Sequence, residues 1–433
     1  MTGPAVATAS RVPPPGARVA VIGAGVAGLT AAHLLSRRHP VTLFERNGYA
    51  GGHTNTIVIP DGPDAGTAVD TGFIVMNHRN YPLFSRLIEQ LGVRLQDSDM
   101  SFSYHCERTG FHYGGNGLDG LFAQRRHLVS ARFWHMLSDI ARFNRRAHDD
   151  LVSGRLAGLT LGEYVVSLEL PHDFTERYLF AMAAAIWSSP AGEIEHFPAE
   201  SFVRFFENHG LLAVTGQPTW RTVTGGSRTY VEALLARFPG RVMLSSGVKG
   251  VRREPDAVRV LTTGGAETFD AVVIATHADE AFGLLADPSE EERAVLGVWE
   301  YSLNHTVLHT DTRVLPPRRR AWCSWNHLRE RAADGAEPVS LTYWMNRLQR
   351  LGTREQYCVT LNRRGSLDER RVLREMTYTH PRFTLASLAS QEALPGLNGS
   401  RRTWYCGSYF GYGFHEDAVR SAVEVGRAFG ETL

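Results

Sequence analysis

Lysine is almost absent from this chain. Among its 433 residues Lys249 is the only lysine, so arginine supplies 45 of the 46 basic side chains. A bias in base composition is the simplest explanation of this preference. Whatever its origin, any reaction that needs a buried lysine has a single candidate residue in this sequence.

Cysteine is scarce as well, and none of its four copies forms a C-x-x-C pair: Cys106, Cys323, Cys358 and Cys406. This argues against a zinc knuckle or a thioredoxin-like site. The 18 histidines include no H-E-x-x-H or similar metal-ligand spacing. His305 and His309 lie four apart in a strand-like stretch, where we expect them to share a face and either pack or line a substrate site. The sequence therefore predicts no metal centre.

Long apolar runs and strong net charge are also missing. No apolar run approaches the 18 residues of a membrane-spanning helix. Residues 1–16 lack the charged start and apolar core of a signal peptide, so we expect a disordered tail. The net charge of +1 provides no field that would attract nucleic acid. We expect a soluble, cytoplasmic protein with no nucleic-acid partner; its oligomeric state stays open.

The stretch "ARVAVIGAGVAGLTAAHLLSRRHPVTLFER" indicates a dinucleotide site. A buried strand over residues 17–22 leads into Gly23, Gly25 and Gly28, which form the pattern GxGxxG. Gly23 permits the tight turn, Gly25 lets the backbone approach a pyrophosphate, and Gly28 lets the following helix pack on the sheet. A second strand ends at Glu45, 20 residues after Gly25, where a carboxylate can accept both ribose hydroxyls of an adenosine.

The next segment, "ERNGYAGGHTNT", resembles the flavin-containing amine oxidoreductase superfamily, whose members carry E-R-x(4)-G-G-[RH]-x-x-T here. The resemblance implies non-covalent FAD, since the family's cysteine motif for covalent attachment is missing. It also implies that this loop follows the pyrophosphate and ribityl chain, "VDTGFIVMN" lies beside the flavin ring, and the backbone of residue 248 meets adenine. The implied contacts are Arg46, Gly52, His53, Thr54, Gly72, Phe73 and Val248. His53 replaces the usual arginine, and either a hydrogen bond to the cofactor or simple packing explains it.

This resemblance implies an α/β fold, with a Rossmann-like GR2-type FAD-binding domain and an inserted α+β substrate domain of antiparallel sheet and helices, as in amine oxidases. We assign residues 17–95, 220–281 and 396–433 to the FAD-binding domain, and residues 96–219 and 282–395 to the substrate domain. The second substrate segment contains aromatic-rich alternating strands that suit an antiparallel sheet. The arginine-rich stretch from Leu121 to Ala147 is typical of an ordinary packed helix, although peripheral membrane contact is the alternative.

Near the end, "GYGFHEDAV" follows a strand and precedes the closing helix. In the superfamily this helix points its N-terminus at the flavin, where its dipole stabilises negative charge. We expect Glu416 or Asp417 near the N-cap, Ala418 and Val419 opening the helix, and Gly407, Ala418 and Val419 contacting the cofactor. Amine oxidases place a cage tyrosine in this loop, and the register puts Phe414 there. The candidates beside the substrate are Phe414, Tyr412 and His415.

The sequence leaves several hypotheses for the substrate open. Superfamily amine oxidases commonly use a lysine near flavin N5, but Lys249 falls in the adenine-side segment. Motifs such as "GGHTNT" and "WCSWNH" resemble a bacterial branch that includes acyl-lipid desaturase flavoproteins associated with cyclopropane-fatty-acid-type methyltransferases. We therefore favour an FAD-dependent oxidoreductase that takes hydride from a largely apolar substrate by desaturation or double-bond isomerisation. An amine or amino-acid oxidase and a non-catalytic FAD-bound partner protein are the alternatives.

Overall fold

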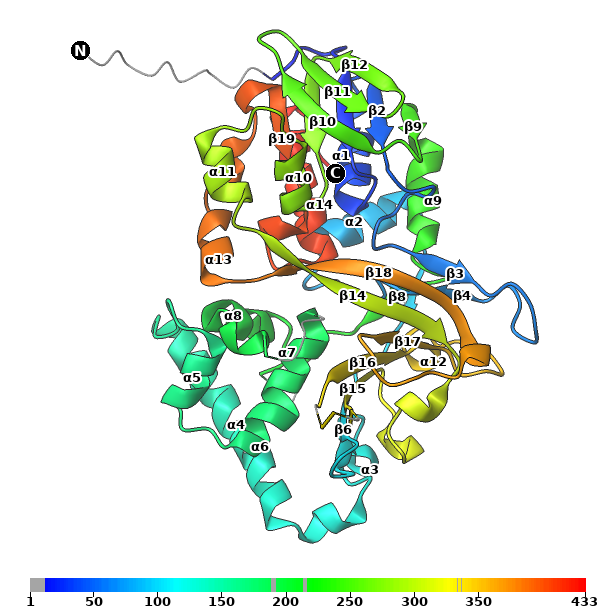
Figure 1. The fold of residues 1–433 in the computed structure, drawn as a ribbon, viewed down its shortest axis with the longest axis vertical. Helices are drawn as coiled ribbons and strands as arrows, with labels where there is room; N and C mark the ends of the chain where they lie inside the picture. The colour runs from blue at the N-terminus through cyan, green and yellow to red at the C-terminus, as the bar shows by residue number, and fades with distance from the viewer. Residues whose placement is uncertain (1–11, 188–191, 213–215, 333, 336) are drawn as a thin grey trace.

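The structure is a computed structural model that describes residues 12–187, 192–212, 216–332, 334–335 and 337–433. Figure 1 shows an elongated molecule with two regions along its long axis. The upper region contains strands β1, β2 and β19 with helices α1, α2 and α14. The lower region contains a second sheet beside a group of helices, and the C-terminus returns to the upper region.

Five strands of the upper region form a parallel sheet in the order β19-β13-β1-β2-β9. Their bounds are β1 Val19–Ile22, β2 Val41–Phe44, β9 Arg241–Met243, β13 Ala271–Ile274 and β19 Thr403–Tyr405. All but β9 are buried along their whole length, as apolar parallel strands are when both faces are covered. Val19 pairs with Val41 on one side and Ala271 on the other, so the C-terminal ends of β1, β2 and β13 meet at one edge.

Successive side chains of these strands point to opposite faces of the sheet. Val19 and Val21 pack against a layer of four helices: α1 Val26–Leu35, α2 Pro82–Leu91, α9 Arg228–Arg237 and α14 His415–Ala428. Ala20 and Ile22 lie in another apolar cluster with the antiparallel strands β10 Val248–Arg253, β11 Val258–Thr262 and β12 Gly265–Phe269, and with the helices α10 Ala278–Leu284 and α11 Glu290–Leu296. The parallel sheet is therefore covered on both faces.

A seven-stranded sheet in the order β18-β14-β17-β16-β15-β6-β7 dominates the lower region. Its bounds are β6 Phe102–Cys106, β7 His112–Gly114, β14 Glu300–His309, β15 Trp325–Arg329, β16 Val339–Trp344, β17 Cys358–Leu361 and β18 Val372–Arg382. Neighbouring strands are antiparallel except β6 and β15, which run parallel. Two further strand pairs are β3 Thr56–Val58 with β4 Ala68–Asp70, and β5 Leu95–Asp97 with β8 Arg221–Val223.

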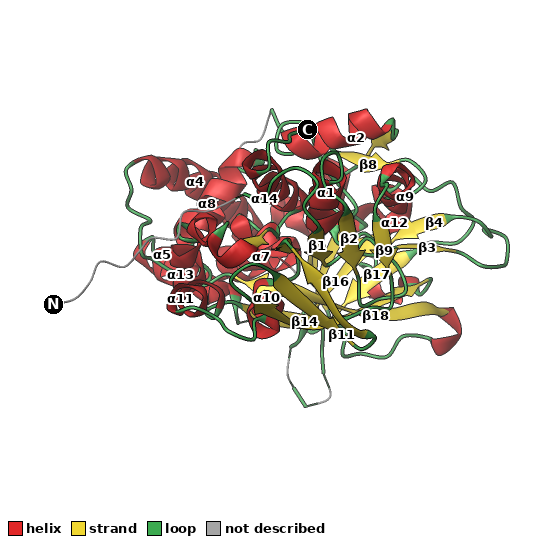
Figure 2. Cartoon of the chain, turned by 90° about the horizontal axis from the view of Figure 1, so that it is seen from above, coloured by secondary structure: helices red, strands yellow, loops and turns green. Residues whose placement is uncertain are grey.

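Helices lie beside this second sheet. Seen from above, α4, α5 and α8 occupy one side of the molecule and the strands β16, β17 and β18 the other (Figure 2). The bounds are α3 Leu118–Leu121, α4 Ala131–Val152, α5 Leu161–Ser167, α6 His172–Phe174, α7 Phe180–Trp187, α8 Ala199–Asn208, α12 Met345–Leu348 and α13 Leu385–Gln391. A one-turn π-helix, Thr175–Leu179, joins α6 to α7.

The predicted fold class is confirmed, with a parallel sheet covered on both faces and a second region of mainly antiparallel sheet plus helices. The exact residue ranges of the two domains stay a prediction. Within the described ranges, no helix combines the length and the apolar character that crossing a membrane requires. All four cysteines are buried and free.

Candidate functional site

A cavity of about 910 Å³ begins at the C-terminal edge of the parallel sheet and extends between the two regions. Its lining comes from the ends of β1, β2 and β13, from β18, from helices α7 and α8, and from the start of α14. The structure brings together at this cavity all the site residues predicted from the sequence except Gly28, Thr54 and Val419. Those three are buried beside it.

The turn between β1 and α1 leaves space that a pyrophosphate can occupy. Gly23 has a φ of +97°, and a Cβ at this position would lie 2.9 Å from the carbonyl oxygen of Ala275. A Cβ at Gly25 would meet no atom within 4 Å. Gly25, Val26 and Ala27 line the cavity where α1 begins. The free N–H groups of a helix N-terminus bind phosphate oxygens, so this turn fits the predicted anion.

Glu45 directly follows β2 at the cavity wall and is 7% exposed. One carboxylate oxygen accepts the Ala24 N–H at 2.9 Å and the other accepts the Asn47 N–H at 2.8 Å. These bonds fix the direction of the carboxylate, and each oxygen keeps a second acceptor position. The carboxylate can therefore still accept a ribose hydroxyl. Arg46 lies at the cavity rim, with its guanidinium 2.6 Å from Glu280.

The loop after Glu45 runs beside the glycine turn. Gly51 pairs with Gly25 in a backbone bridge. Gly52 is also close to Gly25, because a Cβ at Gly52 would lie only 3.2 Å from the Gly25 Cα. Gly52 also has a φ of +59°, which disfavours other residues. Val248, the first residue of β10, lines the same end of the cavity. An anion-binding turn and a ribose-directed carboxylate that line one cavity of about 910 Å³ together fit FAD.

Three histidines meet where the loop contacts β18. The ring of His53 lies 5.7 Å from that of His277 and 5.3 Å from that of His380. His53 donates from Nε2 to the Thr379 carbonyl at 3.0 Å, and His380 Nδ1 accepts from the Asn304 amide at 2.9 Å. Burial, followed by the field of the neighbouring His53 ring, lowers the pKa of His277 and of His380 to about 3. Neutral rings at the cavity wall can hydrogen-bond a cofactor without adding charge.

These rings do not form a metal centre. Across the part of the chain that the structure describes, no group of three or more His, Cys, Asp or Glu side chains could hold a metal ion.

Phe73 and His415 stack on each other and form part of the cavity wall. Their rings stack with centroids 3.6 Å apart and an angle of 16°. His415 Nε2 lies 3.0 Å from Thr54 Oγ1 and 3.1 Å from the Tyr230 hydroxyl. Burial, followed by the field of His53, lowers the pKa of His415 to about 3. The imidazole is a neutral part of the wall, and because its Nε2 is already engaged by Thr54 and Tyr230, it fits positioning better than proton transfer.

The start of α14 differs from the prediction. The helix begins at His415 with Phe414 as its N-cap, three residues before Ala418. The Ala418 N–H already bonds to the Phe414 carbonyl at 3.1 Å, and Val419 packs in the core of the helical layer. The N–H groups without intrahelical partners are therefore those of His415, Glu416 and Asp417. The prediction placed the start too late because it assumed an acidic residue at the N-cap. The capping side chain is instead that of Asp417, the third residue of the helix.

Each of the two acidic residues has a structural task. Asp417 accepts the backbone N–H groups of Phe414 at 3.1 Å and Tyr412 at 3.0 Å, which fixes the loop before the helix. Glu416 accepts the N–H groups of Leu83 at 3.1 Å and Phe84 at 2.9 Å, and so caps the first turn of α2. Burial raises the pKa of both carboxyl groups. The triplet His415-Glu416-Asp417 therefore builds the helix start and is not an acid–base cluster.

An aromatic wall closes the cavity beyond the start of α14. The Phe414 ring stacks on Phe205 with centroids 5.0 Å apart, and Trp187 lies 6.5 Å away. Phe205 in turn stacks on His209 at 3.8 Å. The wall continues with Tyr412, Met182, Ile186 and Trp220. The sequence identified Phe414 and Tyr412 but missed Trp187, Phe205 and His209. The i, i+4 spacing of Phe205 and His209 on a helix was the one signal available.

Gly28, Thr54 and Gly407 support the cavity through their contacts with neighbouring segments. A Cβ at Gly28 would lie 1.8 Å from the Gly23 carbonyl oxygen, so this glycine permits the turn itself. Thr54 joins Tyr230 to His415 by hydrogen bonds. Gly407 does line the cavity, and its N–H bonds to Ser421 of α14 at 2.9 Å, which ties the last strand to the closing helix.

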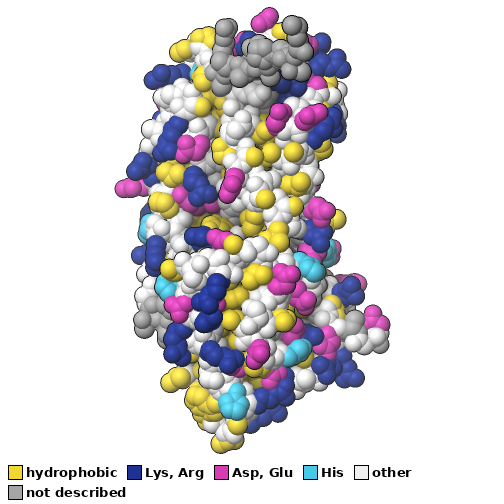
Figure 3. Space-filling view, turned by 90° about the vertical axis from the view of Figure 1, so that its left-hand side faces the viewer, with side chains coloured by type: hydrophobic (Ala, Val, Ile, Leu, Met, Phe, Trp, Pro, Cys, Tyr) yellow, Lys and Arg dark blue, Asp and Glu magenta, His cyan; other side chains and the backbone are white. Residues whose placement is uncertain are grey.

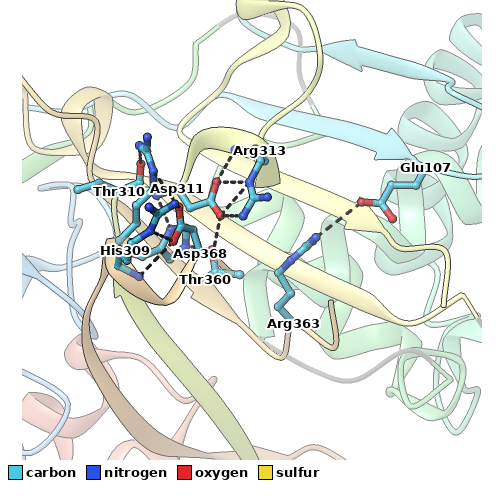
Figure 4. A network of polar contacts seen from close by, with 10 residues as sticks. Glu107, His309, Thr310, Asp311, Arg313, Thr360, Arg363 and Asp368 are labelled. Carbon is cyan, nitrogen blue, oxygen red and sulfur yellow. Dashed lines mark hydrogen bonds and ion pairs between the residues drawn. The ribbon is translucent and has the colours of Figure 1, made fainter. Parts of the chain in front are cut away.

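A second polar cluster lies at the far end of β14 (Figure 4). His309 bonds to Thr360 at 2.7 Å and accepts the Asp311 N–H at 3.1 Å, while Asp311 binds Arg313. His309 is buried, whereas His305 is exposed beside Glu375. Neither histidine lines the cavity. The two histidines have different surroundings because β17 pairs with β14 from Thr306 to His309, so that His309 lies within this pairing and His305 beyond it.

A family model described as flavin containing amine oxidoreductase matches residues 26–425. By sequence, no curated protein gives a significant match.

Solved structures similar to the chain span almost its whole length. A CLA-producing fatty acid isomerase from P. acnes has a TM-score of 0.67 at 15% identity, covering 95% of this chain and 98% of its own. Putrescine oxidase with bound putrescine has a TM-score of 0.70 at 14% identity, covering 95% and 98%. Cyclohexylamine oxidase from Brevibacterium oxydans has a TM-score of 0.69 at 13% identity, covering 96% and 99%. At such low identity the likeness establishes the fold alone.

Proposed function

The chain belongs to the flavin-containing amine oxidoreductase family, with FAD as its cofactor, and from this premise we propose that it takes hydride from carbon in a largely apolar substrate. The product would be a new or relocated carbon–carbon double bond. A fatty acid isomerase with the same fold supports this choice of chemistry but does not decide it. The lining of the cavity carries the proposal.

Charge is confined to one end of that lining. The charged side chains among the described lining residues are Glu45, Arg46, Lys249 and Glu280, and all four lie at the sheet end of the cavity. The end closed by Phe414 and Phe205 contains aromatic, aliphatic and neutral polar groups. Placing an ammonium ion there without a carboxylate costs several kcal/mol, about 2–7 even for an unpaired neutral polar group. A neutral, apolar substrate avoids this cost.

The protein's contribution is to hold the substrate and the charge that develops. Bound FAD supplies the hydride acceptor. The stacked rings of Phe414 and Phe205 present a flat apolar surface against which a carbon chain can be oriented. The free N–H groups of His415 and Glu416 at the start of α14 are oriented to stabilise negative charge. Exclusion of water by the aromatic wall strengthens that stabilisation.

Desaturation also releases a proton, and His209 is placed to receive it. Its Nδ1–H donates to the Phe205 carbonyl at 2.9 Å, so the neutral ring keeps an acceptor lone pair on Nε2. Burial lowers the pKa of His209 to about 4, which keeps the ring neutral at pH 7. The ring lines the cavity and its centroid lies 6.3 Å from that of Phe414.

Anaerobic mixing distinguishes this function from its alternatives. We expect acyl lipids with a saturated or isolated-double-bond chain to bleach the flavin absorbance or yield an isomerised chain, while simple amines do neither. Mass spectrometry of the lipid and stopped-flow absorbance at the flavin band measure both. Bleaching by amines alone would identify an amine oxidase. A flavin that dithionite reduces but neither substrate class changes would indicate a non-catalytic FAD protein.

Replacing Phe414 with alanine should slow substrate-dependent flavin reduction by about a hundredfold while FAD content stays unchanged. The aromatic ring orients the substrate, whereas the backbone N–H of residue 414, which Asp417 accepts, remains in the variant. Phe414→Tyr is the matched control, because it keeps the flat ring, and it should reduce at a rate near the wild type. A variant that loses FAD but keeps its reduction rate per bound flavin would contradict this role.

A further inference from the structure

An exposed apolar surface lies at the end of the lower region, far from the parallel sheet. Side chains between α3 and the start of α4 face solvent to an unusual degree: Leu118 is 75% exposed, Leu128 50%, Val129 89% and Trp134 49%. We call this set the tip surface. Figure 3 shows hydrophobic side chains gathered at the lower extremity of the molecule, with basic side chains close by.

Contacts show that the tip surface is one continuous feature. Trp134 donates from its indole nitrogen to the Leu128 carbonyl at 3.0 Å, which holds the ring beside the turn that carries Val129. The Trp134 ring also lies 5.6 Å from Phe122, which follows Leu118 by one helical turn. The apolar groups are thus fixed in place on a folded support and do not project from a loose loop.

Arginines surround the tip surface. Six exposed arginines lie on the same segment or on the adjoining turn, which contacts α3: Arg125, Arg126, Arg132, Arg318, Arg319 and Arg320. Arg125 and Arg320 share the single carboxylate of Asp119, and Arg132 pairs with Asp173. Six arginines against two aspartates leave a local charge of +4 on a chain whose net charge is only +1. The remaining three have no carboxylate partner among the described residues.

We propose that the tip surface docks on a bilayer that contains anionic lipids. Exposed tryptophan and aliphatic side chains enter the boundary between head groups and acyl chains, and arginines around them bind lipid phosphates. The rim carries one sign of charge, with a local excess of +4, which complements the negative surface of an anionic bilayer. The charge pattern therefore favours a lipid surface over a second protein.

The tip surface is linked to the cavity by aromatic packing. Tyr113 lines the cavity and lies 6.1 Å from Phe133, the first core residue of α4. Phe133 lies 5.9 Å from Phe122, which contacts Trp134. Docking would thus place the bilayer against the end of the molecule that this aromatic chain connects to the cavity. Membrane docking itself does not depend on the proposed reaction, because its test measures binding to vesicles and not turnover.

Vesicle co-sedimentation of the FAD-loaded protein tests the proposal. We expect binding to vesicles of phosphatidylcholine with about 30% phosphatidylglycerol, and little binding to phosphatidylcholine alone. Val129→Asp should lower the partition coefficient at least tenfold, because it places a charge at the most exposed apolar position. Arg126→Gln with Arg319→Gln should lower the partition coefficient about twenty-fivefold, from roughly a fivefold effect of each charge. Added salt should weaken binding of the wild type.

The matched control is Val166→Asp, which changes another strongly exposed valine, 76% accessible, on helix α5. It should bind vesicles like the wild type, and all variants should keep the wild-type flavin spectrum. Wild-type protein that stays in the supernatant with anionic vesicles would overturn the proposal. So would vesicle binding that Val129→Asp leaves unchanged. A dimer in size-exclusion chromatography that Val129→Asp dissociates, without vesicle binding, would assign the tip surface to a second copy of the chain instead.

Discussion

Replacing Gly25 with valine is expected to give a folded protein that no longer retains FAD, with affinity reduced by at least about a hundredfold. The backbone at Gly25 has φ −70° and ψ 178°, which any residue adopts. A Cβ at this position meets no protein atom within 4 Å. The added side chain therefore costs the empty protein little, and it projects into the space that fits the pyrophosphate.

The same substitution three residues later should have the opposite consequence. A Cβ at Gly28 would lie 1.8 Å from the Gly23 carbonyl oxygen and 3.2 Å from the Ala275 side chain. The turn would have to open, which should lower the free energy of unfolding by about 3 kcal/mol or prevent folding. Within one motif, Gly25 is thus needed for binding the ligand and Gly28 for folding.

Two measurements separate these effects. Far-ultraviolet circular dichroism with thermal melting reports folding, and flavin absorbance after gel filtration, followed by titration with FAD, reports binding. Both variants add the same volume, so each is the other's control. Comparison must use FAD-free wild type, because bound cofactor raises apparent stability. Two results would contradict the placement of the pyrophosphate at this turn. One is a Gly25→Val protein that keeps FAD, and the other is a Gly25→Val protein that melts at a temperature as low as Gly28→Val.

Local patterns explain why so much of this architecture was predictable. The first strand, the glycine turn and α1 depend on interactions within about twenty residues, and the structure places them at 19–22 and 26–35. The loop at Gly51-Gly52 and the segment at Gly72-Phe73 came from a motif, and both line the cavity. What such motifs cannot give is a contact between distant segments.

The aromatic wall is the clearest example of that limit. Phe205 and Phe414 stack although more than 200 residues separate them, and no spacing in the sequence relates the two. The cluster of His53, His277 and His380 depends in the same way on β18 crossing beside the glycine loop. The predicted start of α14 was wrong for a local reason, because Asp417 caps the helix from inside its first turn.

Asp70 should be a critical structural residue, and Asp70→Ala is expected to lower the free energy of unfolding by about 4 kcal/mol. The side chain is fully buried. Its oxygens accept from Thr56 at 2.5 Å, from the Ser227 N–H at 2.9 Å and hydroxyl at 2.8 Å, and from Gln349 at 2.9 Å. The carboxylate joins β4 to the start of α9 and the end of α12. Each buried donor left without a partner costs about 1–3 kcal/mol.

Chemical denaturation at pH 8 measures this loss, with Asp61→Ala as a control at an exposed aspartate of the neighbouring loop. Asp70→Asn should also be costly, because its amide N–H₂ would face either the Ser227 donors or the Gln349 amide. A loss below 1 kcal/mol in Asp70→Ala would show that water replaces the carboxylate and that the junction is not essential.

The difference in free energy of unfolding between wild type and Asp70→Ala should depend on pH. This dependence tests whether burial or hydrogen bonding dominates the pKa of Asp70. Burial raises the pKa of Asp70 to about 6, against the opposing effect of its hydrogen-bond donors. A folded-state pKa above the unfolded value of about 4 means that the folded protein binds the extra proton between about pH 6 and pH 4. The stability that this proton contributes is complete below pH 4 and lost as the pH rises through 6. The gap between wild type and Asp70→Ala should therefore widen on acidification from pH 8, by up to about 3 kcal/mol. A gap that narrows instead would mean that the donors outweigh burial and hold the carboxylate ionised.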